Sequence, residues 1–598
     1  MKTYSLIATF FALFFLMIFS SCTVQSKKKE SNQTATDTLN KKWWKEAVVY
    51  QIYPRSFQDT NGDGVGDLKG IISHLDYVKS LGVDVIWLNP IYSSPNADNG
   101  YDISNYDSIM KEFGTMKDFD ALLSEMHKRS LKLVMDLVVN HSSDQHEWFK
   151  KSRSSRANPY RNYYHWWPAE KGIPPFRPCY FDEDGSAWKY DKLTNSYYLH
   201  YFSYKQPDLN WENPALRKEI YAMMNRWLKK GVDGFRMDVI PFISKDTTFP
   251  VITEQILKEK FNNDWSQAAA SGPHLHEYLQ EMNKEVLSKY DIMTLAEGAG
   301  TTQKTAMNFV DPARHELDMS YHFDGVSIGY IPGQFKQMDP NGFKLTEFKK
   351  VYSQWDNVFE HKGWGTIYLG NHDQPRMVTR WGNDREHFRA ISSKMLSTFL
   401  LTMRGTPFYY FGDELGMSNI KFNSINDYRD IETISIYKRT KDVGGDLNYF
   451  LEGQKISARD NGRTPFQWDA SEKAGFTTGT PWIKINKNKN KVNVKSEEKD
   501  SNSTLNYFKK LVQLRKNNKE VLVYGSYELL DKDNPNVYAY KRTSANKKIL
   551  VLLNFKSVDA KSKTGIDLSN AKVLLSNYPN AKVNENLKPY QALVLELK

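Results

Sequence analysis

The stretch GFRMDVI (residues 234–240) places an arginine and an aspartate two positions apart within an apolar run. Side chains alternate between the two faces of a strand, so Arg236 and Asp238 are expected on one side and Phe235 and Met237 on the other. A cation held beside a carboxylate favours the ionised acid. By itself such a pair is typical of a buried structural ion pair, and its meaning depends on the segments around it.

Short apolar segments rich in β-forming residues recur along the chain and alternate with helical patterns, which is typical of βα units. There are eight of them, at residues 47–54, 83–91, 132–141, 231–240, 292–298, 320–324, 366–373 and 406–414. We therefore predict an α/β fold, a (β/α)8 TIM barrel with a closed sheet of parallel strands.

Five of these segments end in ionisable residues that directly follow apolar ones. The residues are Asp136 to His141, Asp238, Glu297, Asp373 and Glu414. Active sites of such barrels lie at the carboxyl ends of the strands. We expect these side chains to converge on one mouth, with Arg236 and Asp238 among them.

Two segments do not follow the βα pattern. Residues 142–209 are crowded with Trp, Tyr, Pro and Gly and are too long for an ordinary loop, which indicates a small domain inserted after the third strand. Residues 524–598 contain alternating strand-like runs without helices, which predicts a C-terminal antiparallel β-sandwich. The catalytic barrel would then comprise residues 43–141 and 210–523.

The N-terminal residues 1–21 have a basic start and a short apolar run, which is typical of a secretory signal peptide. Cys22 follows two serines, as in the lipobox of bacterial lipoproteins, and would become the acylated first residue. Residues 22–42 are poor in apolar side chains and predict a flexible tether. We expect an exported cell-envelope lipoprotein, periplasm-facing or in the outer membrane, that contacts the membrane only through its lipid.

The net charge of +11 comes largely from lysines in polar tracts such as residues 26–30 and 484–491, which are typical of solvated loops. We therefore expect no nucleic-acid partner. We also expect no organic cofactor and a monomer. Cys179 is the one cysteine besides Cys22, so lipidation of Cys22 would leave no internal disulfide.

Five motifs stand in an order that resembles the α-amylase superfamily, glycoside hydrolase family thirteen. They are DLVVNH (136–141), QPDLN (206–210), GFRMD (234–238), the strand that ends at Glu297, and NHDQPR (371–376). The similarity extends over the chain from Trp43, and ARDNGRTPFQWD (458–469) resembles the oligo-1,6-glucosidase and dextran glucosidase branch.

The resemblance implies a retaining glycosidase in which Asp238 is the nucleophile, Glu297 the general acid/base and Asp373 the carboxylate that steadies the transition state. A retaining mechanism needs two carboxyl groups about 5 Å apart, one to attack the anomeric carbon and one to protonate the leaving oxygen. Arg236 would hold Asp238 as the anion. His141 and His372 match family histidines that donate to hydroxyls of the same sugar.

The resemblance also implies a closed pocket and a linkage preference. Asp98, Tyr101 and Arg459 match residues that close the pocket around the non-reducing end, which implies exo action on short oligosaccharides. Arg463 lies four residues beyond Arg459, and the sequence leaves open which of the two points inward. Val239, directly after the nucleophile, matches the valine of α-1,6-acting members, which favours isomaltose-type substrates with α-1,4 bonds as further candidates.

The loop DTNGDGVGD (59–67) has oxygen donors at alternate positions and Gly64 at the sharp turn, as a calcium loop requires. It departs from an EF-hand because Gly70 stands where a bidentate glutamate belongs. The resemblance implies a structural Ca²⁺ site of this branch, with Mg²⁺ as a second possibility and a plain Asp/Asn/Gly turn as the alternative. The implied ligands are Asp59, Asn61, Asp63, the Val65 carbonyl and Asp67.

Two other functions remain as alternatives. A sucrose isomerase or other transglucosylase shares the nucleophile and the acid/base, but such members carry an arginine-rich loop where this chain reads VTRWGNDREHFR (378–389). A non-catalytic glycan-binding lipoprotein would lose the carboxylates that this chain keeps. FGDE (411–414) stands where relatives have QGEE, and its consequence is open.

The lipidation hypothesis predicts that Cys22→Ser abolishes labelling of the protein by a clickable fatty acid and releases it from the membrane fraction. The measurement is fluorescence of the labelled band together with fractionation of the cells. A Cys22→Ser protein that stays in the membrane fraction would show that Cys22 is not the anchor.

Overall fold

The computed structural model describes residues 41–182 and 184–598. The predicted signal peptide, Cys22 and all but the end of the predicted tether lie outside these residues. Among the described residues, no helix is both long and apolar enough to cross a bilayer.

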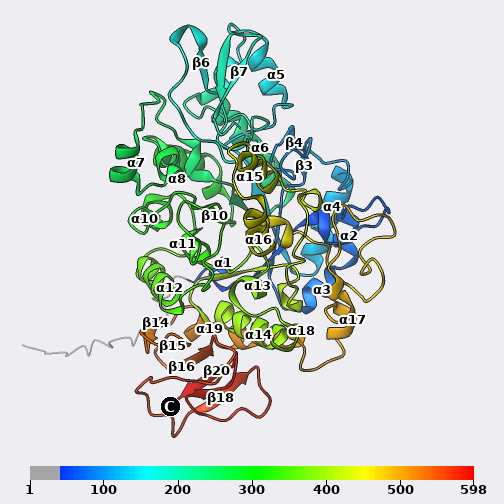
Figure 1. The fold of residues 1–598 in the computed structure, drawn as a ribbon, viewed down its shortest axis with the longest axis vertical. Helices are drawn as coiled ribbons and strands as arrows, with labels where there is room; N and C mark the ends of the chain where they lie inside the picture. The colour runs from blue at the N-terminus through cyan, green and yellow to red at the C-terminus, as the bar shows by residue number, and fades with distance from the viewer. Residues whose placement is uncertain (1–40, 183) are drawn as a thin grey trace, which may run out of the picture. The chain divides into compact units, whose positions relative to one another are not determined.

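Eight parallel strands form the central sheet (Figure 1). They are β1 (Val49–Ile52), β2 (Val85–Leu88), β5 (Lys132–Leu137), β9 (Gly234–Met237), β10 (Met293–Glu297), β11 (Met319–Tyr321), β12 (Thr366–Ile367) and β13 (Thr406–Tyr410). They neighbour one another in the order β11, β10, β9, β5, β2, β1, β13, β12, and a parallel bridge from Ser320 to Gly365 joins the two ends. The predicted barrel is confirmed, although β12 is shorter than its apolar segment.

Helices follow the strands in turn. They are α2 (Leu68–Ser73) with α3 (Leu75–Ser80), α4 (Met116–Lys128), α6 (Pro214–Lys230), α9 (Leu275–Glu285), α10 (Ala306–Val310), α12 (Leu345–Phe359), α14 (Glu386–Thr402) and α18 (Thr504–Asn517). Residues at the helix ends determine where the helices begin and end. Thr115 and Asp118 form a capping box at the start of α4. Gly231 ends α6 with a φ of 108°, a conformation that glycine adopts without strain.

The inserted segment forms a small antiparallel sheet beside helix α5 (Glu147–Ser154) (Figure 1). Its strands β6 (Trp166–Pro168), β8 (Ser196–Leu199) and β7 (Trp188–Asp191) neighbour one another in that order. Antiparallel bridges from His141 to Asp208 and from Tyr164 to Leu209 bring the two ends of the segment together. The insertion therefore starts and finishes at the carboxyl end of β5.

A buried ammonium group fixes that junction. Lys245 Nζ donates to Asn140 Oδ1 at 2.8 Å and to the Phe242 carbonyl at 2.6 Å, and it lies 3.1 Å from Asp208 Oδ2. These partners come from the end of β5, the turn after β9 and the end of the inserted segment. Because the group is buried and fully paired, losing one partner would leave an uncompensated charge.

The C-terminal residues form a five-stranded antiparallel sheet and a two-stranded pair (Figure 1). The sheet contains β14 (Ser526–Leu530), β15 (Val537–Thr543), β16 (Lys548–Asn554), β20 (Ala592–Leu597) and β18 (Lys572–Ser576); the pair is β17 (Ala560–Lys561) with β19 (Asn586–Leu587). Arg542 Nη1 donates to the Thr402 carbonyl at 2.7 Å, at the end of α14. Helix ends leave unpaired carbonyls, so a buried guanidinium there joins the sheet to the barrel.

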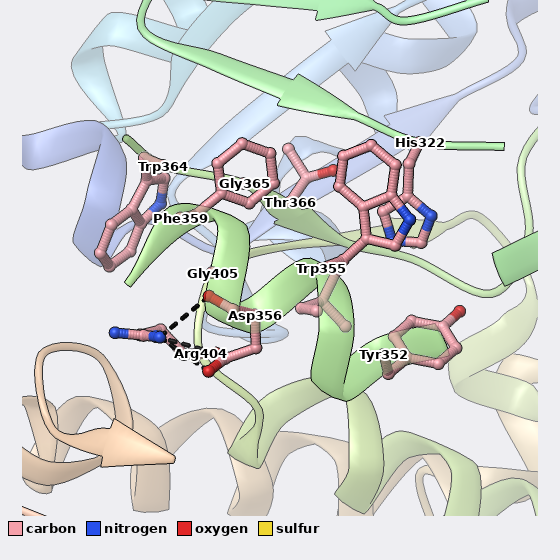
Figure 2. A pocket seen from close by; sticks show the side chains of 11 residues that line it. His322, Tyr352, Trp355, Asp356, Phe359, Trp364, Gly365, Thr366, Arg404 and Gly405 are labelled. Carbon is pink, nitrogen blue, oxygen red and sulfur yellow. Dashed lines mark hydrogen bonds and ion pairs between the residues drawn. The ribbon is translucent and has the colours of Figure 1, made fainter. Parts of the chain in front are cut away.

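A void of about 20 Å³ lies between α12, β12 and the turns next to β11 and β13 (Figure 2). Arg404 reaches both carboxylate oxygens of Asp356, at 2.8 and 2.7 Å, and the rings of His322 and Trp355 stack 4.4 Å apart. The void is too small for a sugar and shares no lining residue with the cavity described below. It is a packing feature of the barrel wall.

Candidate active site

A cavity of about 440 Å³ opens at the carboxyl ends of the barrel strands. Eight of the residues predicted for the site line it: Asp98, Tyr101, His141, Asp238, Val239, Glu297, Asp373 and Arg459. Arg236 and His372 are buried beside them and contact the lining residues. The volume is within the range typical of small-molecule sites, about 300–1,000 Å³.

The Arg236 guanidinium is shared by three carboxylates. Arg236 Nη1 lies 2.6 Å from Asp238 Oδ1 and 2.8 Å from Asp136 Oδ1, and Nη2 lies 2.6 Å from Glu297 Oε1. The register explains the meeting, because Asp136 on β5 and Leu295 on β10 both pair with Arg236 on β9. Asp238 and Glu297 are thus held on one cation at the floor of the cavity.

Burial raises the pKa of Asp238, and the nearby charge of Glu297 raises it further, while Arg236 opposes both effects. Burial also raises the pKa of Asp136 to about 6, and the charge of Arg236 opposes this rise. One guanidinium therefore faces three buried acids, and it does not neutralise all of them. Arg236 is the cation in this cluster that favours the ionised form of Asp238, against burial and the charge of Glu297.

Val239 has a φ of 35°, which is the left-handed region and strained for a β-branched residue. This conformation directs the Val239 N–H to Glu297 Oε2 at 2.8 Å, while the Tyr321 hydroxyl donates to Glu297 Oε1 at the same distance. The Val239 side chain lines the cavity. The strained turn after β9 therefore couples the position of Glu297 to the residue that follows Asp238.

Asp373 lies among cationic and imidazole groups. Its Oδ1 accepts from Arg459 Nη1 at 3.1 Å and from Arg463 Nη2 at 3.0 Å, and its Oδ2 lies 3.1 Å from His372 Nε2. Burial alone would raise the pKa of Asp373, but these neighbours hold it below the usual range. Burial lowers the pKa of His372 to about 3, so at neutral pH the two arginines supply the charge.

Arg459 and Arg463 differ in position, which the sequence left open. Arg459 lines the cavity, and its Nη2 reaches Asp98 Oδ1 at 3.4 Å. Arg463 lies behind Asp373, where its Nε donates to the His372 carbonyl at 2.8 Å. The inward-facing residue is Arg459.

His372 and His141 are fixed by buried polar partners. The Tyr101 hydroxyl lies 2.6 Å from His372 Nε2, and the two rings stack at 5.3 Å. Gln206 Nε2 lies 3.2 Å from His141 Nε2 and donates to Asp98 Oδ2 at 3.2 Å. Burial lowers the pKa of His141 to about 3, so both imidazoles are neutral groups suited to hydrogen bonding with hydroxyls.

One predicted strand end lies away from the mouth of the barrel. Glu414 does not line the cavity but accepts from the hydroxyls of Tyr50 and Tyr77, at 2.7 and 2.8 Å. Gly412, with a φ of 89°, turns the chain after β13. Glu414 of FGDE therefore contributes to packing between β1 and α3.

Further residues that were not predicted from the sequence help to build the cavity. Tyr321 was detectable as the end of the weak strand β11. Asp430 and Glu432 gave no such signal; they lie at the start of α15 (Ile431–Asp442) and approach Arg459 Nε at 2.9 and 3.3 Å. Phe181, from the inserted segment, lines the cavity with its ring 4.9 Å from the Arg459 guanidinium.

The loop 59–67 offers hard oxygen donors, a chemistry that suits Ca²⁺. The same oxygens also accept hydrogen bonds within the loop: Asp59 Oδ1 from the Asn61 and Gly62 N–H groups, and Asp63 Oδ1 from the Val65 N–H. Asp67 caps α2 through Gly70 N at 2.7 Å. Among the described residues, the carboxylates of Asp59, Asp63 and Asp67 do not place one oxygen each within 4.8 Å of the other two.

Residues 51–525 match the family described as "Alpha amylase, catalytic domain". The chain is 51% identical to an oligo-1,6-glucosidase of Parageobacillus thermoglucosidasius, over 94% of this chain and all of that protein. It is 45% identical to a trehalose-6-phosphate hydrolase of Bacillus subtilis (strain 168), over 93% of this chain and 98% of the relative.

Among solved structures, an isomaltulose synthase from Klebsiella sp. LX3 matches with a TM-score of 0.89 and 44% identity, over 94% of this chain and all of that one. The predicted family and fold are thereby confirmed. Because the family match and the relatives both span nearly the whole described chain, this protein belongs to the α-amylase family of glycoside hydrolases, family thirteen.

Proposed function

We propose that this glycoside hydrolase is a retaining, exo-acting α-glucosidase that hydrolyses α-1,6 bonds of short oligosaccharides such as isomaltose. The observation that carries the proposal is the sharing of Arg236 by Asp238 and Glu297 in a cavity that Asp373 also lines. The similarity to oligo-1,6-glucosidases over nearly the whole chain supports the substrate class.

In this proposal an Asp238 carboxylate oxygen forms a bond to the anomeric carbon while the bond from that carbon to the glycosidic oxygen breaks. The leaving oxygen takes the electron pair and a proton from Glu297. Water, deprotonated by Glu297, then forms a bond to the anomeric carbon while the bond from that carbon to Asp238 breaks, which frees Asp238 and gives glucose with retained configuration. Tyr321 and the Val239 N–H hold Glu297 in place, and Asp373 accepts from sugar hydroxyls as positive charge develops on the ring.

Exo action is supported by the wall around Asp373. Arg459 contacts Asp98 and Asp373 together, and its guanidinium also contacts the buried Asp430 and Glu432, which lines the cavity. Because these paired charges close one side of the cavity, the cavity accepts only the terminal sugar of a chain. The hydroxyls of that sugar replace the water bound to the charged side chains.

The sucrose-isomerase alternative is favoured by one observation, the similarity to isomaltulose synthase. Against it, no residue of the described loop 378–389 lines the cavity. Incubation with sucrose distinguishes the two functions, because an isomerase gives a rearranged disaccharide whereas a hydrolase gives glucose and fructose.

Glu297→Gln is expected to lower kcat on isomaltose by about 10²–10⁴-fold, because its alkoxide leaving group needs a proton. A fluoride or aryl glucoside with a good leaving group should still glucosylate Asp238 and accumulate the adduct, which intact-protein mass spectrometry detects. Azide should speed turnover and give the α-glucosyl azide. Asp238→Asn should be inactive on both substrates without an adduct.

The matched control is Glu414→Gln, a buried strand-end glutamate outside the cavity. The ratio of its activities on the two substrates should equal that of the unmodified protein, whatever its folded fraction. A β-glucosyl azide product, or an adduct on a residue other than Asp238, would refute the proposed roles.

Val239→Thr is expected to raise the ratio of kcat/KM for maltose to that for isomaltose. The two side chains have similar shapes, so the change adds a hydroxyl while keeping the strained turn. A tenfold change in the ratio corresponds to about 1.4 kcal/mol of differential transition-state binding. The control is Val232→Thr, which changes a buried valine just before the same strand. An unchanged ratio in Val239→Thr would show that Val239 does not determine the linkage preference.

We also propose that the loop 59–67 binds a structural Ca²⁺, supported by its three carboxylates and one amide oxygen. Ca²⁺ at about 100 times its Kd should raise Tm by about 2 °C, measured by calorimetry after treatment with a chelator. Asp63→Asn should abolish the shift, whereas the exposed Asp533→Asn should keep it. An equal shift in Asp63→Asn and the unmodified protein would leave the loop as a hydrogen-bonded turn only.

A further inference from the structure

A second group of chemically reactive side chains lies in the inserted domain. Cys179, Asp182 and His200 each place a ligand atom within 4.8 Å of the other two, and they are the one such set of His, Cys, Asp or Glu within residues 41–182 and 184–598. All three side chains are buried. None of them lines the sugar cavity.

His200 has an unusual environment for a buried histidine. Its side chain is fully buried, yet neither ring nitrogen has a hydrogen-bond partner. Nδ1 lies 3.4 Å from Asp182 Oδ2, which the Tyr204 N–H already occupies at 2.6 Å. A neutral imidazole carries a lone pair on one ring nitrogen, which can bind a metal ion. Buried polar atoms are almost always satisfied, which indicates a missing partner.

The Cys179 thiol is the second donor. Its sulfur accepts from the Asp182 N–H at 3.3 Å and from Arg439 Nη2 at 3.5 Å. Metal binding would exchange the thiol proton for the ion, since thiolate is the ligand form.

We propose that Cys179, Asp182 and His200 form a binding site for Zn²⁺ or a similar borderline divalent transition metal. A sulfur, an imidazole nitrogen and a carboxylate oxygen are the ligands that such ions prefer, whereas Ca²⁺ and Mg²⁺ take oxygen. A site with three protein ligands keeps water at the fourth position. A cavity of about 200 Å³ lined by Cys179 and Tyr201 provides space next to the thiol.

The ion would fix one wall of the sugar cavity. Cys179 and Asp182 flank Tyr180 and Phe181, which line that cavity, and His200 directly follows β8. A metal bridge from the loop to β8 would hold both aromatic side chains in place. Binding of the ion does not depend on which linkage the enzyme cleaves.

The test is titration of the metal-free full-length protein with Co²⁺, followed by displacement with Zn²⁺. A thiolate-to-cobalt charge-transfer band that saturates at one equivalent and disappears with Zn²⁺ is expected. Cys179→Ser and His200→Gln should each weaken Zn²⁺ binding by more than about 100-fold, beyond the 10–100-fold effect of residues that only support ligands. Cys22→Ser and His361→Gln, a histidine with an 86% exposed side chain, are the matched controls and should bind normally.

A measurement on the unmodified protein covers the case in which the buried variants fail to fold. Zn²⁺ should slow the alkylation of Cys179 at least tenfold, as measured by peptide mass spectrometry. Binding of Zn²⁺ should also release a proton from the protein. The site is refuted if no charge-transfer band forms, if the band persists in folded Cys179→Ser, or if alkylation proceeds at the same rate with and without Zn²⁺.

Discussion

The Arg236 guanidinium is the constraint on which the site depends. It is fully buried and contacts carboxylates from three neighbouring strands, β5, β9 and β10. Parallel register places these residues in one layer, and removing the cation would leave buried charges uncompensated, at a cost of about 3–5 kcal/mol when one partner of such a pair is lost. The same contacts orient Asp238 and Glu297, so folding and chemistry depend on one side chain.

Other buried cations assemble the rest of the molecule. Lys245 joins the inserted domain to the barrel, Arg459 gathers Asp98, Asp373 and Asp430, and Arg542 joins the C-terminal sheet to α14. Each connects segments that are distant along the chain. Because charged hydrogen bonds are directional, they fix orientation where apolar packing fixes only proximity.

The inserted domain contributes more than a cover for the barrel. Phe181 packs against Arg459 and is flanked by residues of the proposed metal site, so one loop takes part in two chemical environments. Strain is concentrated nearby: Val239, next to Asp238, has a positive φ and gives its N–H to Glu297. Such backbone conformations persist where surrounding contacts enforce them.

Apolar periodicity and the polar residue that follows it are local properties, so the eight strands and the polar residues at their ends could be predicted from the chain alone. The expected roles of Asp238, Glu297 and Asp373 came from the resemblance to a family. The prediction was wrong at Glu414, since Gly412 and the hydroxyls of Tyr50 and Tyr77 set its direction. Packing decides that Arg459 rather than Arg463 faces the cavity, that Asp430 lies behind it, and that His200 meets Cys179 and Asp182. These contacts join segments whose separation in sequence carries no periodic signal, and buried charge satisfaction selects them only once the chain has packed.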